Sequence, residues 1–446
     1  MASLDALEHG QKLGTEVFAS QPPGFYVLLE AERALFGSSV VAIRVGMLLL
    51  ALFGCFCAYY IGRLMAGPRG GFLAFALLAT PSRVEDEAIR VRADLPSVTL
   101  SLMAIAVALF ATRRKGVPGL VAAGLAGGAL ASAVSIKLLA VAAVIPVLAI
   151  VLGRHELRFA VAFATGAAAV AVALVGYYSD VLGPLWNEVV RFHLNAQTAA
   201  VQGAPRDVGG NVAKVVGTLT DFHGPRSPFP WLVLVGAAGT VLAWRRRQIL
   251  DPLLLWLWAA TASAFLILHK PLWAHDVVML TASLAVASAV GLAMLLSDSR
   301  LLLRVVASGS VLLVAATITH HLSEVTRGES RGIEWAAAAL RSRTPQGSEV
   351  ASDLPIVPFL ANRRQPGAIV DTSWTRLGSG SLTEAEFLHT AERDRVSAVV
   401  VGHNFARDPK LRRALKGRFP VVLREKGVSL PGERPEELRI FLRAHS

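Results

Sequence analysis

The sequence predicts a mainly α-helical, polytopic membrane bundle of about ten spans, with an extracytoplasmic α/β domain at its C-terminal end. Hydrophobic residues make up 54% of the 446 residues, and the mean hydropathy of +0.52 is too high for a soluble domain. The apolar residues gather in runs of helical length, with basic residues in the short loops between them. From about residue 321 the composition changes and a continuous β-branched run appears, which is typical of a buried strand.

The apolar runs define the predicted spans, although several are shorter than the ~20 residues that an upright helix needs. They lie at about residues 39–63, 70–82, 96–112, 117–134, 137–153, 159–178, 231–244, 253–269, 277–296 and 300–319. Short basic loops alternate with acidic or mixed loops, and cytoplasmic loops collect Lys and Arg. The basic loops contain Arg63, Arg69, residues 113–115, Arg154, Arg158, residues 245–247, Arg300 and Arg304. With these loops in the cytoplasm, the parts outside are residues 1–38, 83–95, 179–230, 270–276 and the tail after 320.

Three domains follow from this topology. Residues 1–38 form an outer segment with an interfacial helix, residues 39–320 form the membrane region, and residues 321–446 form a soluble outer α/β domain. The membrane region carries a long outer loop at 179–230, in which residues 186–193 are amphipathic and predict a second surface helix. Strands of the outer domain are expected at 349–353, 368–371, 396–401 and 438–442.

The interfacial helix is predicted from the segment at 21–26, of sequence QPPGFY, and the residues that follow it. Residues 27–36 have apolar positions at helical spacing but also carry Glu30, Glu32 and Arg33. That stretch is too short and too charged to span a bilayer, so it is expected to lie at the membrane surface. The two prolines fix the start of the helix and prevent the preceding chain from continuing as helix.

Several functional classes have no support in the sequence. The excess of 44 Lys and Arg over 32 Asp and Glu is a topology signal, and no basic stripe interleaved with aromatics predicts a nucleic-acid partner. Cys55 and Cys57 are two residues apart in an apolar run, so their side chains face different ways and predict neither a disulfide nor a metal site. No HExxH, GxSxG, P-loop, CxxC or EF-hand pattern occurs, and no cofactor is assigned. Carboxylates are present but no metal-ligand spacing stands out, so the sequence leaves metal dependence open.

The first candidate constellation is the outer loop at 81–96, which holds four carboxylates and three arginines. One interpretation is a solvated loop whose charges compensate one another. The other places Asp94 at the mouth of a helix with Pro96 in its first turn, where the helix N-terminus stabilises a carboxylate. Arg90 and Arg92 would then pair with the phosphate of a lipid.

Two further candidates are cations near the outer surface. Lys137 interrupts an apolar stretch from about 117 to 153 and either snorkels to the surface or binds an anion at a turn between two short helices. The outer loop at 269–276 carries Lys270, His275 and Asp276, which are either interface residues or contacts to a phosphate and an acceptor.

The order of these motifs resembles the GT-C superfamily of membrane glycosyltransferases. The likeness is to the bacterial branch that includes protein O-mannosyltransferases and lipid A aminoarabinose transferases, and it covers residues 1 to about 320. It consists, in order, of QPPGFY at 21–26, LFGS at 35–38, AIR at 42–44, the outer loop ending in RAD at 92–94, SIK at 135–137 and the loop with His275.

The resemblance implies a multi-pass cell-membrane enzyme that transfers a hexose or pentose from a polyprenyl-phosphate carrier, with inversion, to an extracytoplasmic acceptor. A carboxylate in an outer loop would act as general base on the acceptor, and cations would stabilise the departing lipid phosphate. The implied partners are the polyprenyl-phosphate sugar, membrane lipid and an acceptor whose class stays open. On this chain the catalytic candidates are Asp94 and Asp5, and the substrate-binding candidates are Gln21, Arg90, Arg92, Lys137, Lys270 and His275.

The chain departs from the family's pattern at its beginning. Members carry an acidic pair some twenty residues before the Pro-Pro, preceded by a membrane helix, whereas only Asp5, Glu8 and Glu16 are available here, and Gln21 stands where a lysine is frequent. We therefore expect a truncated start, and the alternative function is a non-catalytic relative that binds lipid or scaffolds a partner. A transporter is disfavoured because no internal repeat is found.

Overall fold

The computed structural model describes most of the chain as two compact units. The described residues are 2–153, 156–198, 204–205, 207–220, 229–247, 251–296, 319, 323, 331–402, 404–405, 409–428 and 436–443. One unit, here called the membrane unit, comprises Gln21–Tyr178 and Pro205–Thr326. The other, here called the sheet unit, comprises Met1–Ser20, Ser179–Ala204 and Arg327–Ser446. The domain boundaries drawn from the sequence stay a prediction.

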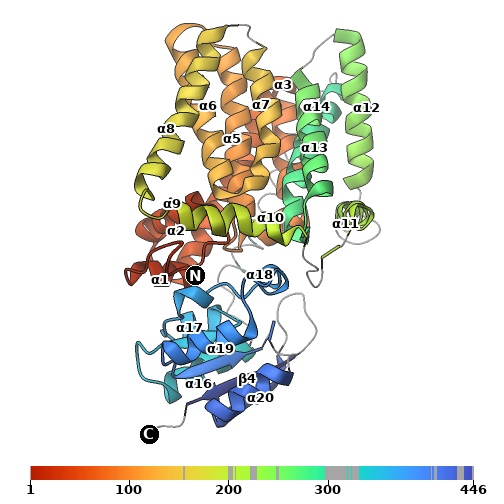
Figure 1. Cartoon of the computed structure of the whole chain (residues 1–446). Helices are drawn as coiled ribbons and strands as arrows, with labels where there is room; N and C mark the ends of the chain where they lie inside the picture. Colours follow the sequence, from red (N-terminus) through yellow and green to blue (C-terminus); the bar gives the residue numbers. More distant parts are fainter. Residues whose placement is uncertain are drawn as a thin grey trace. The chain divides into compact units, whose positions relative to one another are not determined.

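The membrane unit is helical throughout its described residues, and its long helices run side by side (Figure 1). Its elements are α2 (Pro23–Phe36), α3 (Val40–Ala79), α4 (Ser82–Ala88), α5 (Asp94–Thr112), α6 (Gly116–Ile136), η1 (Leu138–Ala143), α7 (Val144–Leu152), α8 (Leu157–Tyr177), α11 (Val208–Thr220), α12 (Phe229–Arg247), α13 (Asp251–Leu268), η3 (Ala274–Val277) and α14 (Val278–Leu295). Six of the described helices are long and apolar enough to cross a membrane: α3, α5, α6, α8, α13 and η3 with α14. The predicted run at 300–319 lies, except for residue 319, outside the described residues, so the count of ten spans stays a prediction.

Helix α3 contains the two apolar runs that the sequence predicts at 39–63 and 70–82. Its backbone leaves the helical region at Ala66 and at Gly67, which has a φ of 73°, and Pro68 follows. The rings of Phe56 and Phe75 lie 5.4 Å apart between centroids, as do those of Tyr59 and Phe72. Because contacts pair positions on either side of Gly67, the chain folds back there into a helical hairpin.

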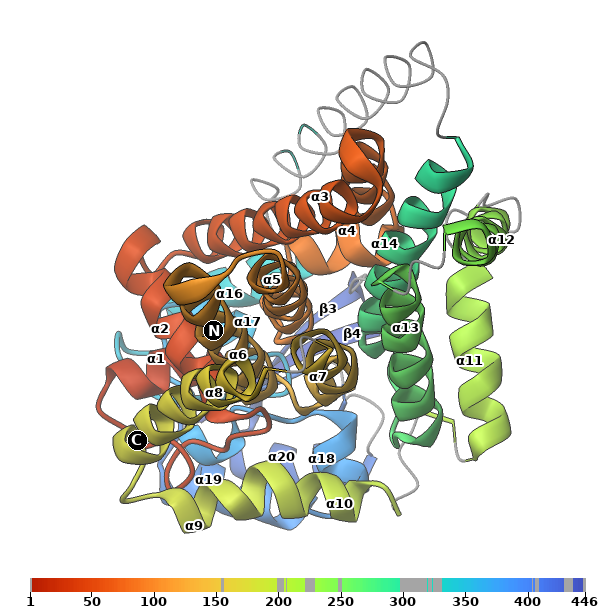
Figure 2. The same cartoon turned by 90° about the horizontal axis from the view of Figure 1, so that it is seen from above.

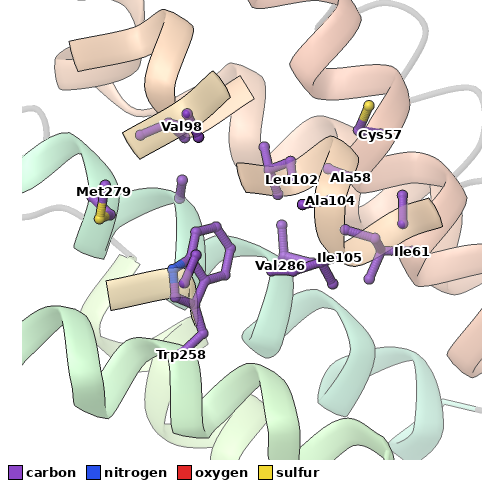
Figure 3. Close-up of a cluster of buried hydrophobic side chains, with 14 of the residues drawn as sticks. Cys57, Ala58, Ile61, Val98, Leu102, Ala104, Ile105, Trp258, Met279 and Val286 are labelled. Atoms are coloured by element: carbon purple, nitrogen blue, oxygen red, sulfur yellow. The ribbon is translucent and has the colours of Figure 1, made fainter. Parts of the chain in front are cut away.

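The core of the bundle surrounds α5. Viewed from above, α5 lies among α3, α6, α7 and α14, and it contacts each of them (Figure 2). Trp258 of α13 is fully buried together with Leu102 and Ile105 of α5, Val286 of α14 and Ile61 of α3 (Figure 3). The start of α5 is thereby held firmly, and that start carries Asp94.

Helix α2 confirms the helix expected after the two prolines, with Pro23 in its first turn. A Cβ added to Gly24 would lie 2.2 Å from Ser135 Oγ, so only glycine allows α2 to approach the end of α6 this closely. One acidic residue of α2 is not at the surface: the side chain of Glu32 is 4% exposed and packs against Gly46 of α3. Among the described residues neither of its carboxylate oxygens has a hydrogen-bond partner, and burial raises the pKa of Glu32 to about 7.

The sheet unit contains a four-stranded sheet of order β1-β2-β4-β3. Its elements are α1 (Ala2–Glu8), α9 (Leu182–Leu185), the π-helical η2 (Trp186–Arg191), α10 (Phe192–Ala196), α16 (Arg331–Arg343), β1 (Val350–Ser352), α17 (Ile356–Leu360), η4 (Gly367–Ile369), α18 (Trp374–Gly378), α19 (Glu384–Arg393), β2 (Ala398–Val401), α20 (Pro409–Arg418), β3 (Val421–Val428) and β4 (Glu436–Leu442). Strands β1 and β2 are parallel, with Val350 opposite Ala398, and the other pairs are antiparallel. Helices α16 and α17 pack on one face of the sheet, and α19 and α20 pack on the other.

The strand predictions are right for β1, β2 and β4. The predicted strand at 368–371 is wrong, because Pro366 leads into the 3₁₀ turn η4 at Gly367–Ile369. Strand β3 was not predicted, since its charged residues in the sequence VVLREKGV suit an edge strand that pairs only with β4. The helix expected at 186–193 is there, formed by η2 and the start of α10.

Close approach of backbones holds α8 to α6. A Cβ on Gly166 of α8 would lie 1.8 Å from the carbonyl oxygen of Gly124, whereas a Cβ on Gly176 of the same helix would meet no atom within 4 Å. We expect Gly166→Ala to lower the free energy of unfolding by about 1–3 kcal/mol, because the two helices must separate. Gly176→Ala is the matched control and should not lower it; thermal unfolding in detergent measures both. Equal stability of the two variants would contradict this packing.

The buried Glu32 predicts a pH dependence of stability. Its pKa is about 7 in the folded protein and 4.5 for the ordinary group, so between these values only the folded state keeps the proton. The free energy of unfolding therefore falls as pH rises from 4.5 to 7 and is constant above that window as far as Glu32 contributes.

Glu32→Gln should make this fall shallower in pH-dependent thermal unfolding. It should not abolish it, because burial also raises the pKa of Glu87 and of Glu188 to about 7. Glu334→Gln, the same change at an exposed position of α16, should leave the slope as it is. An unchanged slope in Glu32→Gln would show that Glu32 titrates normally.

Candidate active site

Asp94 is the first residue of α5, and Pro96 follows in the first turn, as the sequence predicts. The side chain of Asp94 is only 5% exposed. Proline suits this position because the first helical N–H groups have no partner within the helix. The carboxylate therefore lies at the positive end of a helix that is buried in the bundle.

Lys137 lies where an apolar helical run is interrupted. Helix α6 ends at Ile136, Lys137 has an extended backbone (φ −149°, ψ 126°), and the 3₁₀ turn η1 begins at Leu138. The side chain of Lys137 is 12% exposed, so it does not snorkel to open water. A lysine at such a break needs a polar partner, because an unpaired buried ammonium is costly.

Two carboxylates supply that partner. Lys137 Nζ pairs with Asp94 Oδ1, and it lies 2.7 Å from Asp276 Oδ1. The other oxygen of Asp276, Oδ2, accepts a hydrogen bond of 2.8 Å from the backbone N–H of Trp273. Burial acts to lower the pKa of Lys137, but the charges and hydrogen bonds of Asp276 and Asp94 outweigh it and hold the pKa above its usual range. Lys137 is thus held as a cation between two buried carboxylates, and we call Lys137, Asp94 and Asp276 together the Lys137 cluster.

Together with His275, the two carboxylates of the Lys137 cluster also form the donor set of a metal site. Ligand atoms of Asp94, His275 and Asp276 all lie within 4.8 Å of one another. Two carboxylates and an imidazole suit Zn²⁺ or Mn²⁺. The ammonium of Lys137 already neutralises the same two carboxylates, so a metal ion would have to share them with it. The sequence leaves metal dependence open.

A second ion pair lies beside Asp94, in the segment from α4 to α5. Arg92 Nη1 is 3.0 Å from Glu87 Oε1, and Glu87 is 3% exposed while Arg92 is 39% exposed. Burial raises the pKa of Glu87 to about 7 although Arg92 opposes the shift; the charge of Asp94 adds to it. Arg90 lies in the turn between α4 and α5, where its N–H donates to the carbonyl of Glu87. Arg92 therefore offers a partly open cation next to the Lys137 cluster.

Helix α11 adds one basic group, Lys214, that sequence reasoning missed. Asn211, fully buried, donates hydrogen bonds to the carbonyl oxygens of Ile267 (2.9 Å) and His269 (2.8 Å), which fixes α11 against the end of α13. Lys214 Nζ lies 5.5 Å from the ring centroid of Trp273, in cation–π geometry. Burial lowers the pKa of Lys214 and of His269, while the nearby charge of Asp276 acts in the opposite direction.

The structure brings together Asp94, Lys137 and His275 of the predicted site residues. The segment at 21–26 also meets the segment at 135–137, through the contact of Gly24 with Ser135. Gln21 precedes α2, and Lys270 is partly buried in the loop between α13 and η3. Asp5 belongs to α1 of the sheet unit, where its carboxylate is 3.7 Å from His9 Nδ1.

Comparisons with known proteins agree with this architecture. The sequence profile of the dolichyl-phosphate-mannose-protein mannosyltransferase family matches residues 20–178. The structure of ArnT from Cupriavidus metallidurans bound to undecaprenyl phosphate superposes with a TM-score of 0.62 at 14% identity, covering 98% of this chain and 92% of that chain. ArnT in the apo state gives 0.64 at 13% identity, covering 98% and 91%. A comparison with curated protein sequences finds no match.

A more distant structure shares the fold over part of its length. The oligosaccharyltransferase AglB from Archaeoglobus fulgidus, in complex with an inhibitory peptide and a dolichol-phosphate, gives a TM-score of 0.50 at 13% identity, covering 91% of this chain and 65% of that chain. These findings confirm that the chain resembles the GT-C superfamily of membrane glycosyltransferases, including protein O-mannosyltransferases and aminoarabinose transferases. With its apolar helices, it is a multi-pass membrane protein.

Removing the central cation tests the Lys137 cluster. Lys137→Met keeps the length of the side chain but leaves Asp94 and Asp276 buried and facing each other, so we expect the free energy of unfolding to fall by about 3–5 kcal/mol. Lys12→Met, which breaks the solvent-exposed pair of Lys12 with Asp180, is the control and should change stability little. Thermal unfolding in detergent compares them, and a Lys137 variant as stable as the control would mean that the carboxylates are not both charged.

Proposed function

We propose that this protein is a membrane glycosyltransferase that moves a sugar from a polyprenyl-phosphate carrier to an extracytoplasmic acceptor. The observation that carries the proposal is the buried cation Lys137, held between Asp94 and Asp276 at a helix break. The fold supports it, since ArnT shares this fold and was solved with undecaprenyl phosphate. A polyprenyl phosphate needs a cation near the membrane boundary and an apolar surface for its chain, and a helical membrane protein offers both.

In this proposal Lys137 binds the phosphate of the donor. Its ammonium already has two anionic partners, so a phosphate competes with Asp94 and Asp276 for it. Arg92, which is partly exposed and paired with Glu87, is the second cation for the phosphate. As the sugar leaves, negative charge grows on the phosphate, and fixed cations stabilise that charge most when water is excluded.

Asp94 is the general base in the same proposal. When Lys137 turns toward the phosphate, the carboxylate of Asp94 is released from its ion pair and can accept the proton of the acceptor's hydroxyl. The deprotonated hydroxyl attacks the anomeric carbon of the sugar while the bond to the phosphate oxygen breaks, and the proton stays on Asp94. A single displacement of this kind inverts the configuration at the anomeric carbon.

We further propose that the sheet unit lies outside the cytoplasm. The acceptor in this proposal is a glycan, lipid or protein that reaches the site from that side. Gln21, Lys270 and His275 contact substrate in this proposal; of these three, His275 lies beside Asp94 and Asp276 of the Lys137 cluster.

The proposal is tested by donor turnover. Protein purified in detergent is incubated with polyprenyl-phosphate-linked mannose, glucose, galactose and aminoarabinose, together with an extract of cell-envelope acceptors. We expect polyprenyl phosphate to be released from one donor, which thin-layer chromatography detects. Asp94→Asn keeps the size of the side chain and one oxygen that can accept from Lys137 but removes the base, so the rate should fall by about 100-fold or more.

Asp5→Asn is the matched control, because it makes the same change at the competing catalytic candidate. It should retain activity, since Asp5 lies in α1 and is not part of the Lys137 cluster. Loss of activity in Asp5→Asn with normal turnover in Asp94→Asn would exchange the two roles. If the wild-type protein binds undecaprenyl phosphate, as followed by phosphorus NMR, but releases no lipid from any donor, the non-catalytic lipid-binding alternative replaces the transferase.

A further inference from the structure

The sheet unit contains a cavity of about 780 Å³ that the proposed transfer reaction does not use. Its described walls come from α18, the start of α19, the residues after β2 and the start of α20. It therefore lies beside the carboxyl end of β2, one of the two parallel strands. In open α/β sheets this edge is where small ligands bind, and the volume is within the usual range of ligand pockets.

Hydrogen bonds from the neighbouring strand hold the wall after β2 in place. Asp353 follows β1, is 2% exposed, and accepts hydrogen bonds of 2.9 Å from the backbone N–H groups of both Gly402 and Phe405. The side-chain amide of Asn404 donates to the carbonyl of Thr372, which precedes α18. These hydrogen bonds connect the wall after β2 to the end of β1 and to the residues before α18.

The lining combines an apolar, partly aromatic side with a few polar groups. Trp374, Leu377, Leu382 and Phe405 form the apolar side. Phe405 is 2% exposed and is supported from behind by Phe387, with 4.7 Å between ring centroids. Trp374 is partly buried and lines the cavity.

The polar groups are Thr383, Glu384, Asn404 and Lys410. The hydroxyl of Thr383 is engaged in capping α19, where it donates to Glu386 Oε2 and accepts from the Glu386 N–H. The carboxylate of Glu384, the amide oxygen of Asn404 and the ammonium of Lys410 supply acceptors and donors without an excess of either charge. Glu384 and Lys410 are exposed and lie at the rim, whereas Asn404 is partly buried. An anionic or strongly cationic ligand would meet a charge of its own sign here.

From this lining we propose that the cavity binds a saccharide. A pyranose ring presents an apolar face of C–H groups, which suits the indole of Trp374, and a rim of hydroxyls, which suits the amide of Asn404 and the carboxylate of Glu384. An extended peptide fits less well, because none of the described lining residues lies in a strand whose edge could pair with it. This site goes beyond the proposed transferase activity. Its lining includes no residue of the Lys137 cluster, and it would bind a free sugar that carries no polyprenyl phosphate.

Binding to the full-length protein tests the proposal. The protein is purified in a zwitterionic detergent without a sugar headgroup, and saturation-transfer NMR is recorded with glucose, galactose, mannose, N-acetylglucosamine and maltose. We expect signals for at least one of these sugars. Trp374→Ala should weaken its binding by about tenfold or more, because truncating a stacked tryptophan removes the main apolar contact.

Three variants make the result decisive. Trp374→Phe keeps an aromatic face and should bind within about threefold of the wild type, which separates loss of stacking from loss of folding. Trp186→Ala removes an exposed indole of the same unit outside the cavity and should bind normally. Asp94→Asn should also bind normally, so failure of this proposal and failure of the transferase proposal are distinguishable.

Three outcomes would overturn the saccharide site. The first is that none of the five sugars binds to the folded wild-type protein, and the second is that the wild type and Trp374→Ala bind sugar equally. The third is displacement of the sugar signals by short unstructured peptides that bind more tightly and lose affinity in Trp374→Ala, which would assign the cavity to a peptide.

Discussion

The attraction between one buried lysine and two buried carboxylates determines how the membrane unit is organised around its candidate site. Lys137 is 43 residues from Asp94 and 139 residues from Asp276, yet the three side chains form one cluster. Each belongs to a different kind of irregularity: the start of α5, the break after α6 and the turn before α14. An isolated charge buried among membrane helices is costly, so the three charged side chains stabilise one another and thereby the helix ends and turns that carry them. The close contact of Gly24 with Ser135 then places the N-terminal end of α2 against the same break.

Much of this architecture could be read from the sequence because the governing rules are local. Apolar runs predict helices, a proline near a helix start predicts its first turn, and a lone lysine within an apolar run predicts a special environment. Asp94 and Lys137 were found in this way. The β-branched run of β2 was also found, because full burial leaves no room for polar alternation.

What could not be read from the sequence depends on long-range pairing. Asp276 was seen as one member of an outer loop, and nothing in that loop indicates that its partner is Lys137. In the sequence, Glu87 is one of several carboxylates of an outer loop, and Lys214 is not singled out within the long loop at 179–230. In the structure, Glu87 lies near Asp94 and Lys214 lies near Asp276. Glu32 has the spacing of a surface charge, but it packs against Gly46, and only the position of α3 makes it buried. In each case the burial of a charge is a property of the neighbouring helix.

The sheet unit is made of three separate segments of the chain, and this limits how the chain can cross the bilayer. Residues before Ser20, residues 179–204 and the C-terminal part belong to one compact body; for example, Phe18 stacks under the guanidinium of Arg376 at 3.7 Å and contacts the ring of Phe192 at 5.4 Å. A single body in water can occupy only one side of a membrane. On the predicted topology, in which this body lies outside the cytoplasm, the chain crosses the bilayer an even number of times between residues 20 and 179, and again between residues 204 and 327. An even number in the first part requires the two arms of α3 on either side of Gly67 to count as two crossings, which is what the separate apolar runs at 39–63 and 70–82 predict.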